Sequence, residues 1–384
     1  MGYFAFALVL GTIPALMTTF QEVLSLSLSD SALTQFFKDG GYLLLSLLGP
    51  ALIVFCGLKL SLFLAFIMAG AGSLMIALNP DGVGFLFAGI FFQGTGFGLG
   101  ILSLLTVLTG LKEKYQKLSM LYSLWGMAGF LAPALVAFAF TKGFSHQVLY
   151  FAYAIIMIAL AFLSIFVNPV QQLETQKTRW SDVARLFKNR VVLGFGVTFL
   201  LIAACDAIVG TWVTTFVESR FQFSRAQSST VLSLFWVAYS IGRFFGDYFI
   251  ARVGKIKSIL ISCIVGSVGL ILFMFAGSIL APFGLTIFGL GVSTMYPAMQ
   301  GYVLERTDVQ VRPHLNGFLH LTGALGCMAL VRLSGIFAEI NLILPLGLSL
   351  VILFVVALLC CRYARADAIK PPELKLQSIN MVAK

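Results

Sequence analysis

The sequence predicts an all-α membrane protein with twelve transmembrane helices arranged as two pseudo-symmetric six-helix bundles. Three observations support this fold class. Hydrophobic residues make up 59% of the 384-residue chain and charged residues only 10%, the mean hydropathy is +0.99, and the apolar runs have the length of a membrane span. Because a hydrocarbon core of ~30 Å requires about 20 apolar residues per helix, a chain of this length accommodates about twelve spans joined by short loops.

The first six predicted spans lie between clusters of glycine, proline and charged residues, which mark the turns. Their approximate ranges are Tyr3–Leu24, Leu33–Phe55, Leu60–Leu78, Val83–Leu108, Leu118–Phe140 and Val148–Val167.

The second six spans follow a longer polar stretch and resemble the first six in length. Their approximate ranges are Val191–Val217, Thr230–Ile250, Ile259–Leu280, Pro282–Leu304, Leu315–Ala338 and Leu342–Cys361.

The polar stretch between the sixth and seventh spans divides the chain into four expected regions. These are a six-helix bundle at 1–167, a linker at 168–190, a second bundle at 191–361 and a tail at 362–384. Within the linker, Trp180–Lys188 has the composition of a short amphipathic helix lying on the membrane surface.

The basic residues predict the orientation of the chain. If both termini are cytoplasmic, 19 of the 25 Lys and Arg residues lie on the cytoplasmic side, four lie on the other side, including Lys38, and two lie within spans. This asymmetry follows the positive-inside rule. We therefore expect a multi-pass protein of a bacterial inner membrane with both termini in the cytoplasm. The charge is explained without nucleic acid, and we expect membrane lipids as surroundings and a monomer.

The sequence gives no sign of a cofactor or a metal centre. No nucleotide-binding fingerprint occurs, the three histidines lack metal-ligand spacing, and none of the six cysteines forms a CxxC pair. Gly94, Gly96, Gly98 and Gly100 lie in an apolar span without a following Lys-Ser/Thr, so they form two overlapping GxxxG pairs for close packing rather than a phosphate loop.

A charged hairpin follows the eighth span. Gly242-Arg243-Phe244-Phe245-Gly246-Asp247 precedes Ala251-Arg252-Val253-Gly254-Lys255, and Arg243, Asp247 and Arg252 are candidate gating residues that pair in one conformation and separate in another. Ordinary orientation charge is the alternative. Gly57-Leu58-Lys59 repeats the hairpin in the first half.

These repeated hairpins resemble those of the major facilitator superfamily, whose two halves each carry a motif of Gly, Asp and Arg or Lys at this loop. The resemblance covers essentially the whole chain and implies alternating-access transport. Val54 and Ala251 stand where the loop aspartates of the family usually lie.

Two further segments are similar to the fucose:proton symporter-like permeases within that superfamily. Asp206 to Trp212 matches an acidic-x-x-x-Gly-x-Trp pattern, and Gly289 to Pro297 matches a Gly, Ser, Tyr-Pro pattern. Ser103 stands where those permeases carry a glutamate, so their proton-coupling scheme is not implied here.

Two charged residues lie deep within predicted spans. Asp206 is fifteen residues into the seventh span, or about 22 Å along the helix, and Arg332 lies at a matching depth in the eleventh. A lone charge at this depth costs ~2.5–3.5 kcal/mol or more, so each requires a partner or a watery cavity. The two residues either form a fixed ion pair or bind solute, with Asp206 taking up a proton. In the second case, Asp206→Asn and Arg332→Gln should each abolish transport.

Other polar and aromatic residues at membrane depth are candidates for contact with a solute, since ring faces stack and hydroxyls need hydrogen-bond partners. Packing is the alternative for each of them. They are Gln93, Trp125, Trp212, Trp236, Tyr296, Gln300 and His320, with Gln21 and Glu22 at the end of the first span as secondary candidates.

The sequence therefore predicts a secondary transporter for a small polar solute, such as a sugar or a sugar acid, with proton coupling left open. Export of amphipathic compounds through a pocket of Phe and Met residues is the alternative within this class. A membrane-embedded enzyme is a different class, but no GxSxG or HExxH motif occurs. A transporter-like receptor is a third possibility.

Overall fold

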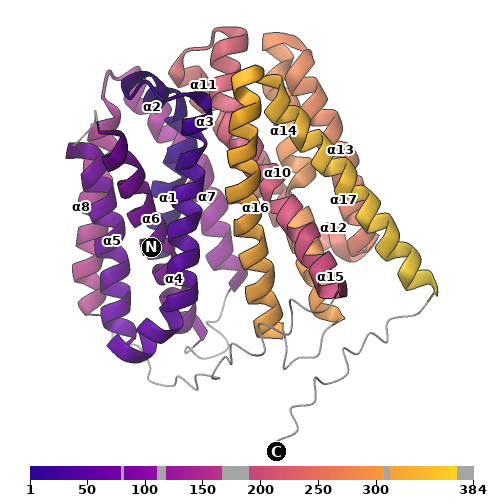
Figure 1. The fold of residues 1–384 in the computed structure, drawn as a ribbon, viewed down its shortest axis with the longest axis horizontal. Coiled ribbons are helices and arrows are strands. Elements are labelled where there is room, and N and C mark those ends of the chain that lie inside the picture. The colour runs from indigo at the N-terminus through magenta and orange to yellow at the C-terminus, as the bar shows by residue number, and fades with distance from the viewer. Residues whose placement is uncertain (79–81, 110–117, 167–189, 307–311, 370–384) are drawn as a thin grey trace, which may run out of the picture. The chain divides into compact units, whose positions relative to one another are not determined.

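The computed structural model describes residues 1–78, 82–109, 118–166, 190–306 and 312–369, and all regular elements in these ranges are α-helices (Figure 1). The predicted amphipathic helix at Trp180–Lys188 lies outside the described residues.

The helices of the first half agree closely with the predicted spans, because long apolar runs end at local Gly, Pro and charge signals. They are α1 (Gly2–Ala15), α2 (Met17–Val23), α3 (Leu28–Ser31), α4 (Leu33–Cys56), α5 (Leu58–Leu78), α6 (Val83–Thr109), α7 (Leu118–Thr141) and α8 (His146–Ile165).

The helices of the second half follow the predicted order as well. They are α10 (Arg190–Phe221), α11 (Arg225–Phe244), α12 (Gly246–Val253), α13 (Lys255–Phe275), α14 (Gly277–Val292), α15 (Met295–Glu305), α16 (Arg312–Ile340) and α17 (Ile343–Ile369). Because α17 continues to Ile369, the predicted tail begins as helix.

Within the described ranges, ten spans are long and apolar enough to cross a membrane, and the bent pair α1 and α2 makes an eleventh. The remaining predicted span, Thr230–Ile250, corresponds to α11 and α12. These two helices are less hydrophobic because they contain polar residues. The order and approximate position of the twelve expected spans are therefore confirmed.

The first span is bent by 57° between α1 and α2. Pro14 lies inside α1 and has no amide hydrogen to donate, and Leu16 leaves the helical conformation with φ −100° and ψ 8°. The apolar run Tyr3–Leu24 predicted one continuous helix here.

The two short hairpins that the sequence marked as a repeat have the same backbone geometry. Gly57 ends α4 with φ 80° and ψ 158°, and Gly254 ends α12 with φ 91° and ψ 150°. Positive φ favours glycine because it lacks a Cβ atom.

The chain divides into two compact units. Unit 1 comprises Met1–Thr175, Val209–Val237 and Met328–Pro345, and unit 2 comprises Gln176–Ile208, Ala238–Cys327 and Leu346–Lys384. Parts of α10, α11 and α16 thus belong to the same unit as the helices of the first half. The division into bundles at 1–167 and 191–361 remains a prediction.

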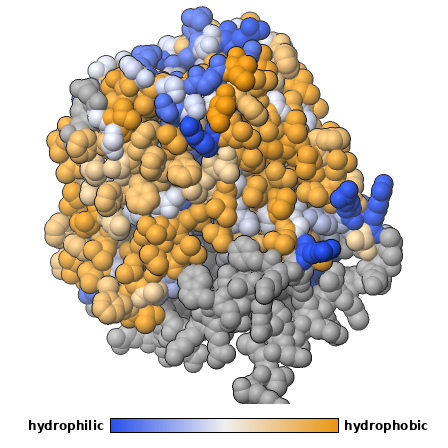
Figure 2. Space-filling model, in the orientation of Figure 1, coloured by the Kyte–Doolittle hydropathy of each residue, from blue (hydrophilic) through white to orange (hydrophobic). Residues whose placement is uncertain are grey.

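Large apolar side chains are exposed on the flanks of several helices, among them Ile155 on α8, Ile264 on α13 and Phe354 on α17. On the face shown in Figure 2, hydrophobic residues cover most of the surface, and hydrophilic ones gather mainly at the end where Figure 1 labels α2, α3 and α11. Such an apolar surface is suited to lipid rather than to water.

The glycines of α6 bring neighbouring helices of unit 1 close to its backbone, as the GxxxG pattern predicted. A Cβ atom at Gly94 would lie 2.0 Å from the carbonyl oxygen of Lys38, and one at Gly98 would lie 2.5 Å from that of Tyr42. One at Gly96 would meet Ala65 on α5 at 2.5 Å. These three glycines thus allow α4 and α5 to pack closely against α6.

Candidate functional site

Asp206 lies at the centre of a polar cluster in unit 2. Tyr239 on α11 donates a hydrogen bond from Oη to Asp206 Oδ2 at 2.7 Å, and Arg243 donates from Nη2 to Tyr239 Oη at 2.8 Å. Tyr239 and Arg243 are four residues apart, so they share one face of α11. Tyr239 therefore connects a carboxylate to a guanidinium of opposite charge.

The cluster continues through two further aromatic residues. The Arg243 guanidinium carbon lies 5.8 Å from the centroid of the Tyr296 ring, and Tyr296 Oη lies 2.8 Å from His320 Nδ1. Phe199 packs against Tyr296, with ring centroids 4.2 Å apart. We call Asp206, Tyr239, Arg243, Tyr296 and His320 the Asp206 cluster; it joins α10, α11, α15 and α16.

The sequence identified three members of this cluster as solute-site candidates, namely Asp206, Tyr296 and His320. Arg243 lies beside Tyr239, and its predicted gating role stays a prediction. Tyr239 itself was missed, although its spacing of four residues from Arg243 was a usable signal.

The other two predicted gating residues lie at the surface. The Arg252 guanidinium lies 4.6 Å from the centroid of the Tyr248 ring, and Asp247 is exposed. Their gating role therefore remains a prediction.

Arg332 has a different partner from the one that its depth suggested. Its Nη1 donates to the backbone carbonyl oxygen of Ser29 and to Ser29 Oγ, the latter at 2.7 Å. The Ser29 amide donates to Glu339 at 2.8 Å. These contacts, all within unit 1, connect α16 to the short helix α3.

Similar contacts connect α10 and α11 to the bent first span within unit 1. Arg225 pairs with Glu22, and the Thr18 hydroxyl donates to Glu218 at 3.1 Å. The Thr214 hydroxyl donates to the carbonyl oxygen of Pro14 at 3.1 Å. We call these interactions, together with those of Arg332 and Glu339 with Ser29, the end contacts.

Several candidates are used in helix packing. Trp212 is fully buried and donates from Nε1 to Ser334 Oγ at 2.8 Å. Gln93 is 1% exposed and donates to Ser73 Oγ at 3.1 Å. The ring of Trp236 covers Gly129, where a Cβ atom would lie 2.9 Å from it. For these three residues the packing interpretation fits the observed surroundings.

The remaining candidates are half-buried. Trp125 contacts Phe97 with a centroid distance of 5.2 Å. Gln300 lies on α15 and Gln21 on α2. Among the residues that the structure describes, no group of three His, Cys, Asp or Glu residues is placed to hold a metal ion.

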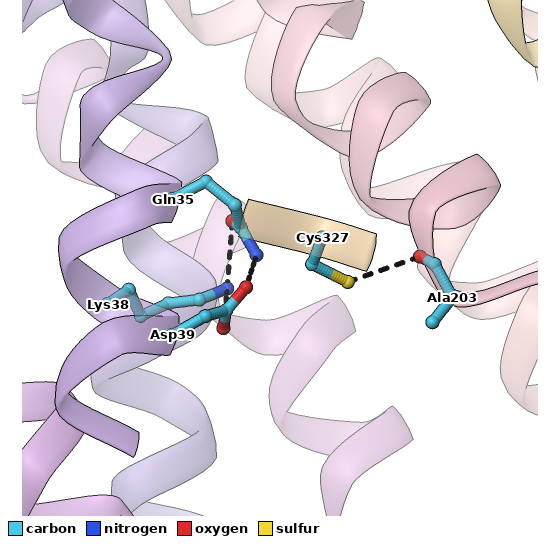
Figure 3. Close-up of polar contacts among 5 residues, drawn as sticks. All are labelled: Gln35, Lys38, Asp39, Ala203 and Cys327. Atoms are coloured by element: carbon cyan, nitrogen blue, oxygen red, sulfur yellow. Dashed lines mark hydrogen bonds and ion pairs between the residues drawn. The ribbon is translucent and has the colours of Figure 1, made fainter. Parts of the chain in front are cut away.

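A second charged cluster, which the sequence analysis did not single out, lies on α4 in unit 1. Lys38 Nζ donates to Gln35 Oε1 at 2.9 Å, Gln35 Nε2 donates to Asp39 Oδ2 at 2.7 Å, and Lys38 Nζ lies 3.8 Å from Asp39 Oδ1 (Figure 3). Lys38 lies near the start of the second predicted span, here α4, where Asp39 offsets its charge. Its position on the side of the membrane opposite the termini stays a prediction.

Figure 3 also shows a contact inside unit 2, where the thiol of Cys327 on α16 lies 3.4 Å from the carbonyl oxygen of Ala203 on α10. The thiol therefore serves as a weak donor between two packed helices.

The sequence of the chain matches the model of the Major Facilitator Superfamily over residues 1–331 and 220–378. The chain therefore belongs to this superfamily of membrane transporters, and the resemblance inferred from the hairpins is confirmed. Together with the apolar helices, this membership defines a multi-pass secondary transporter of a small-molecule solute.

Curated relatives cover most of the chain. A TsgA protein homolog of Edwardsiella ictaluri is 27% identical over 339 residues, which is 83% of this chain and 82% of the relative. The TsgA protein of an Escherichia coli strain is 23% identical over 347 residues, with 84% and 82% covered.

Solved structures share the fold. The nucleoside transporter NupG has a TM-score of 0.75 at 16% identity, covering 95% of this chain and 96% of its own. A D-xylose-proton symporter has a TM-score of 0.70 at 14% identity, with 92% and 94% covered. A bacterial homolog of the human lysosomal transporter Spinster, inward-facing and unoccupied, has a TM-score of 0.76 at 10% identity, with 96% of both chains covered.

Proposed function

We propose that this transporter imports a small, hydroxyl-bearing solute in symport with protons. The observation that carries the proposal is the Asp206 cluster, which places a carboxylate, a guanidinium, two phenols and an imidazole together on four membrane-embedded helices. Ionisable groups at this depth are costly and are typical of solute and proton pathways.

The chemistry of the cluster suits both solute binding and proton coupling. The phenols and the imidazole donate and accept hydrogen bonds, as the hydroxyl groups of a solute require. Proton uptake by Asp206 removes the negative charge that Tyr239 connects to Arg243. The pairing then weakens, and solute and proton binding become linked in one site.

Two of the fold relatives support this solute class. One is described as a nucleoside transporter and another as a D-xylose-proton symporter. Both kinds of solute carry hydroxylated rings. A sugar or related metabolite is therefore our proposed cargo.

We propose a monomer in the bacterial inner membrane. The charge asymmetry supports an orientation with both termini in the cytoplasm, since 19 of 25 basic residues then lie on the cytoplasmic side. In this orientation the end contacts face the outside and close the transporter there, as alternating access requires.

Purified protein in proteoliposomes tests the proposal with a panel of sugars, sugar acids, nucleosides and hydrophobic amines. We expect an imposed inward proton gradient to drive uphill uptake of a sugar or nucleoside, and a protonophore to abolish it. Uptake that does not depend on the proton gradient would contradict proton coupling. Transport of the amines alone would instead favour an exporter of amphipathic compounds.

Arg332→Gln should loosen the end contacts. A hydrogen bond to a charged group contributes ~1.5–3 kcal/mol, so its loss should raise the rate at which a charged, membrane-impermeant thiol reagent labels Thr19→Cys from outside by roughly tenfold or more. Thr19 is only 2% exposed in the closed arrangement. Lys142→Gln at an exposed loop position is the control, and an unchanged labelling rate in Arg332→Gln would refute a closing role.

A further inference from the structure

The half of the chain without Asp206 also carries polar groups that the proposed function has not used. On α4, the residues Gln35, Lys38, Asp39 and Tyr42 follow the i, i+3, i+4, i+7 spacing of a single helix face. The exposed apolar residues Leu44, Leu47 and Leu48 lie on the opposite side of the helix. The polar face is therefore directed away from lipid.

The charged pair on this face has hydrogen-bonding capacity left over. The side chains of Lys38 and Asp39 are 18% and 13% exposed, and their 3.8 Å separation is longer than a direct ionic hydrogen bond of ~2.7–2.9 Å. Gln35 bridges them. An ammonium group has three donors and a carboxylate about four acceptor positions, so both groups can bind a further ligand without separating.

Aromatic rings from four helices begin one turn further along α4. Tyr42 stacks on Phe97 of α6 at 5.3 Å, and Trp125 of α7 lies 5.2 Å from Phe97 and 6.0 Å from Tyr3 of α1. Tyr42, Phe97 and Trp125 are half-buried rather than sealed in the core. All of these residues belong to unit 1. A charged pair one helical turn from a group of half-buried rings is suited to a molecule with hydroxyls on one edge and an apolar face.

The charges further restrict the ligand. Lys38 is offset by Asp39, and Arg243 is connected to Asp206 through Tyr239. The Lys38–Asp39 pair sums to zero net charge, so an anionic solute would gain no uncompensated cation from it, whereas neutral hydroxyls find both donors and acceptors.

Resting on the proposed function, we propose that Lys38, Asp39 and Trp125 form a second solute subsite that selects a neutral, hydroxyl-bearing ring over its acid counterpart. Lys38 donates to one hydroxyl, Asp39 accepts from its neighbour, and the apolar ring face stacks on Trp125. Gln35 positions the two charges.

Ligand-dependent quenching of tryptophan fluorescence in the purified full chain tests the selectivity with D-galactose against D-galacturonate and D-xylose against D-xylonate, at matched ionic strength. The wild type should bind each neutral sugar with a lower Kd than its acid counterpart. Asp39→Asn leaves Lys38 uncompensated and should shift the ratio of the two Kd values at least tenfold towards the acid. Lys142→Gln, which removes an exposed charge, should leave the ratio unchanged.

Stacking is tested on α7. Trp125→Leu should weaken D-galactose binding about tenfold, measured by thermal shift, and Trp125→Phe should restore much of it. Phe138→Leu, at an exposed position on the same helix, should have no effect. Failure of every neutral sugar to bind the wild type, a wild-type preference for the acid, or an Asp39→Asn ratio equal to that of the wild type would overturn the subsite.

Flux measurements separate this inference from the proposed function. Asp39-dependent selectivity without transport in proteoliposomes would leave the subsite in place and refute the proposed function. Proton-driven uptake together with a ratio of Kd values that Asp39→Asn does not change would support the proposed function and refute the subsite.

Discussion

Asp206→Asn should eliminate uphill solute accumulation, lowering it by about fiftyfold or more, while solute counterflow stays within about fivefold of the wild type. The amide of Asn is similar in size to the protonated carboxyl group, so it can still accept the hydrogen bond from Tyr239. It cannot release a proton, and the proton gradient therefore loses its connection to the solute.

The measurement compares proton-driven uptake with counterflow in the same proteoliposome preparation. Glu305→Gln is a matched control, because Glu305 is a carboxylate at an exposed position where it pairs with Lys255. Undiminished accumulation by Asp206→Asn would remove Asp206 from the proton pathway, and equal loss of both activities would make it a solute-binding residue instead.

Gly94→Ala should destabilise the protein far more than Gly84→Ala on the same helix. The added Cβ atom at Gly94 would lie 2.0 Å from the Lys38 carbonyl oxygen, whereas nothing lies within 4 Å of one at Gly84. Overpacking of this kind costs ~1–3 kcal/mol or more, which corresponds to a fall in Tm of roughly 5–10 °C.

Thermal unfolding of the two variants in one detergent checks this result. The difference also tests the register of α4 against α6, which places Lys38 and Asp39. Equal Tm values for the two variants would show that α4 and α6 lie further apart than in the structure.

Most of the fold could be predicted because span signals are local. The second span was expected at Leu33–Phe55 and is found at Leu33–Cys56. The bend at Leu16 was missed because Pro14 within an apolar run is compatible with a continuous membrane helix.

The candidate site was harder to predict, since hydropathy and residue counting give the depth of a residue in the membrane but not the direction in which its side chain points. Residue counting predicted matching depths for Asp206 and Arg332, yet Arg332 turns to Ser29 and Asp206 to Tyr239. Two residues at one level of a bundle can point to different neighbours, and only tertiary packing decides which. The contacts of Lys38 with Gln35 and Asp39 could not be predicted from a count of loop charges, because such a count does not consider pairing within one helix.

The end contacts differ among themselves in how they respond to the surrounding medium. Glu22 and Arg225 are 66% and 33% exposed, so dissolved ions screen their attraction over ~8 Å at physiological ionic strength. The half-buried bonds of Arg332 to Ser29 are shielded from this screening. If these contacts face outwards, as proposed, a rise in external salinity weakens the pair of Arg225 with Glu22 and leaves the bonds of Arg332 in place, so the salt concentration of the habitat would help to set the balance between open and closed carriers.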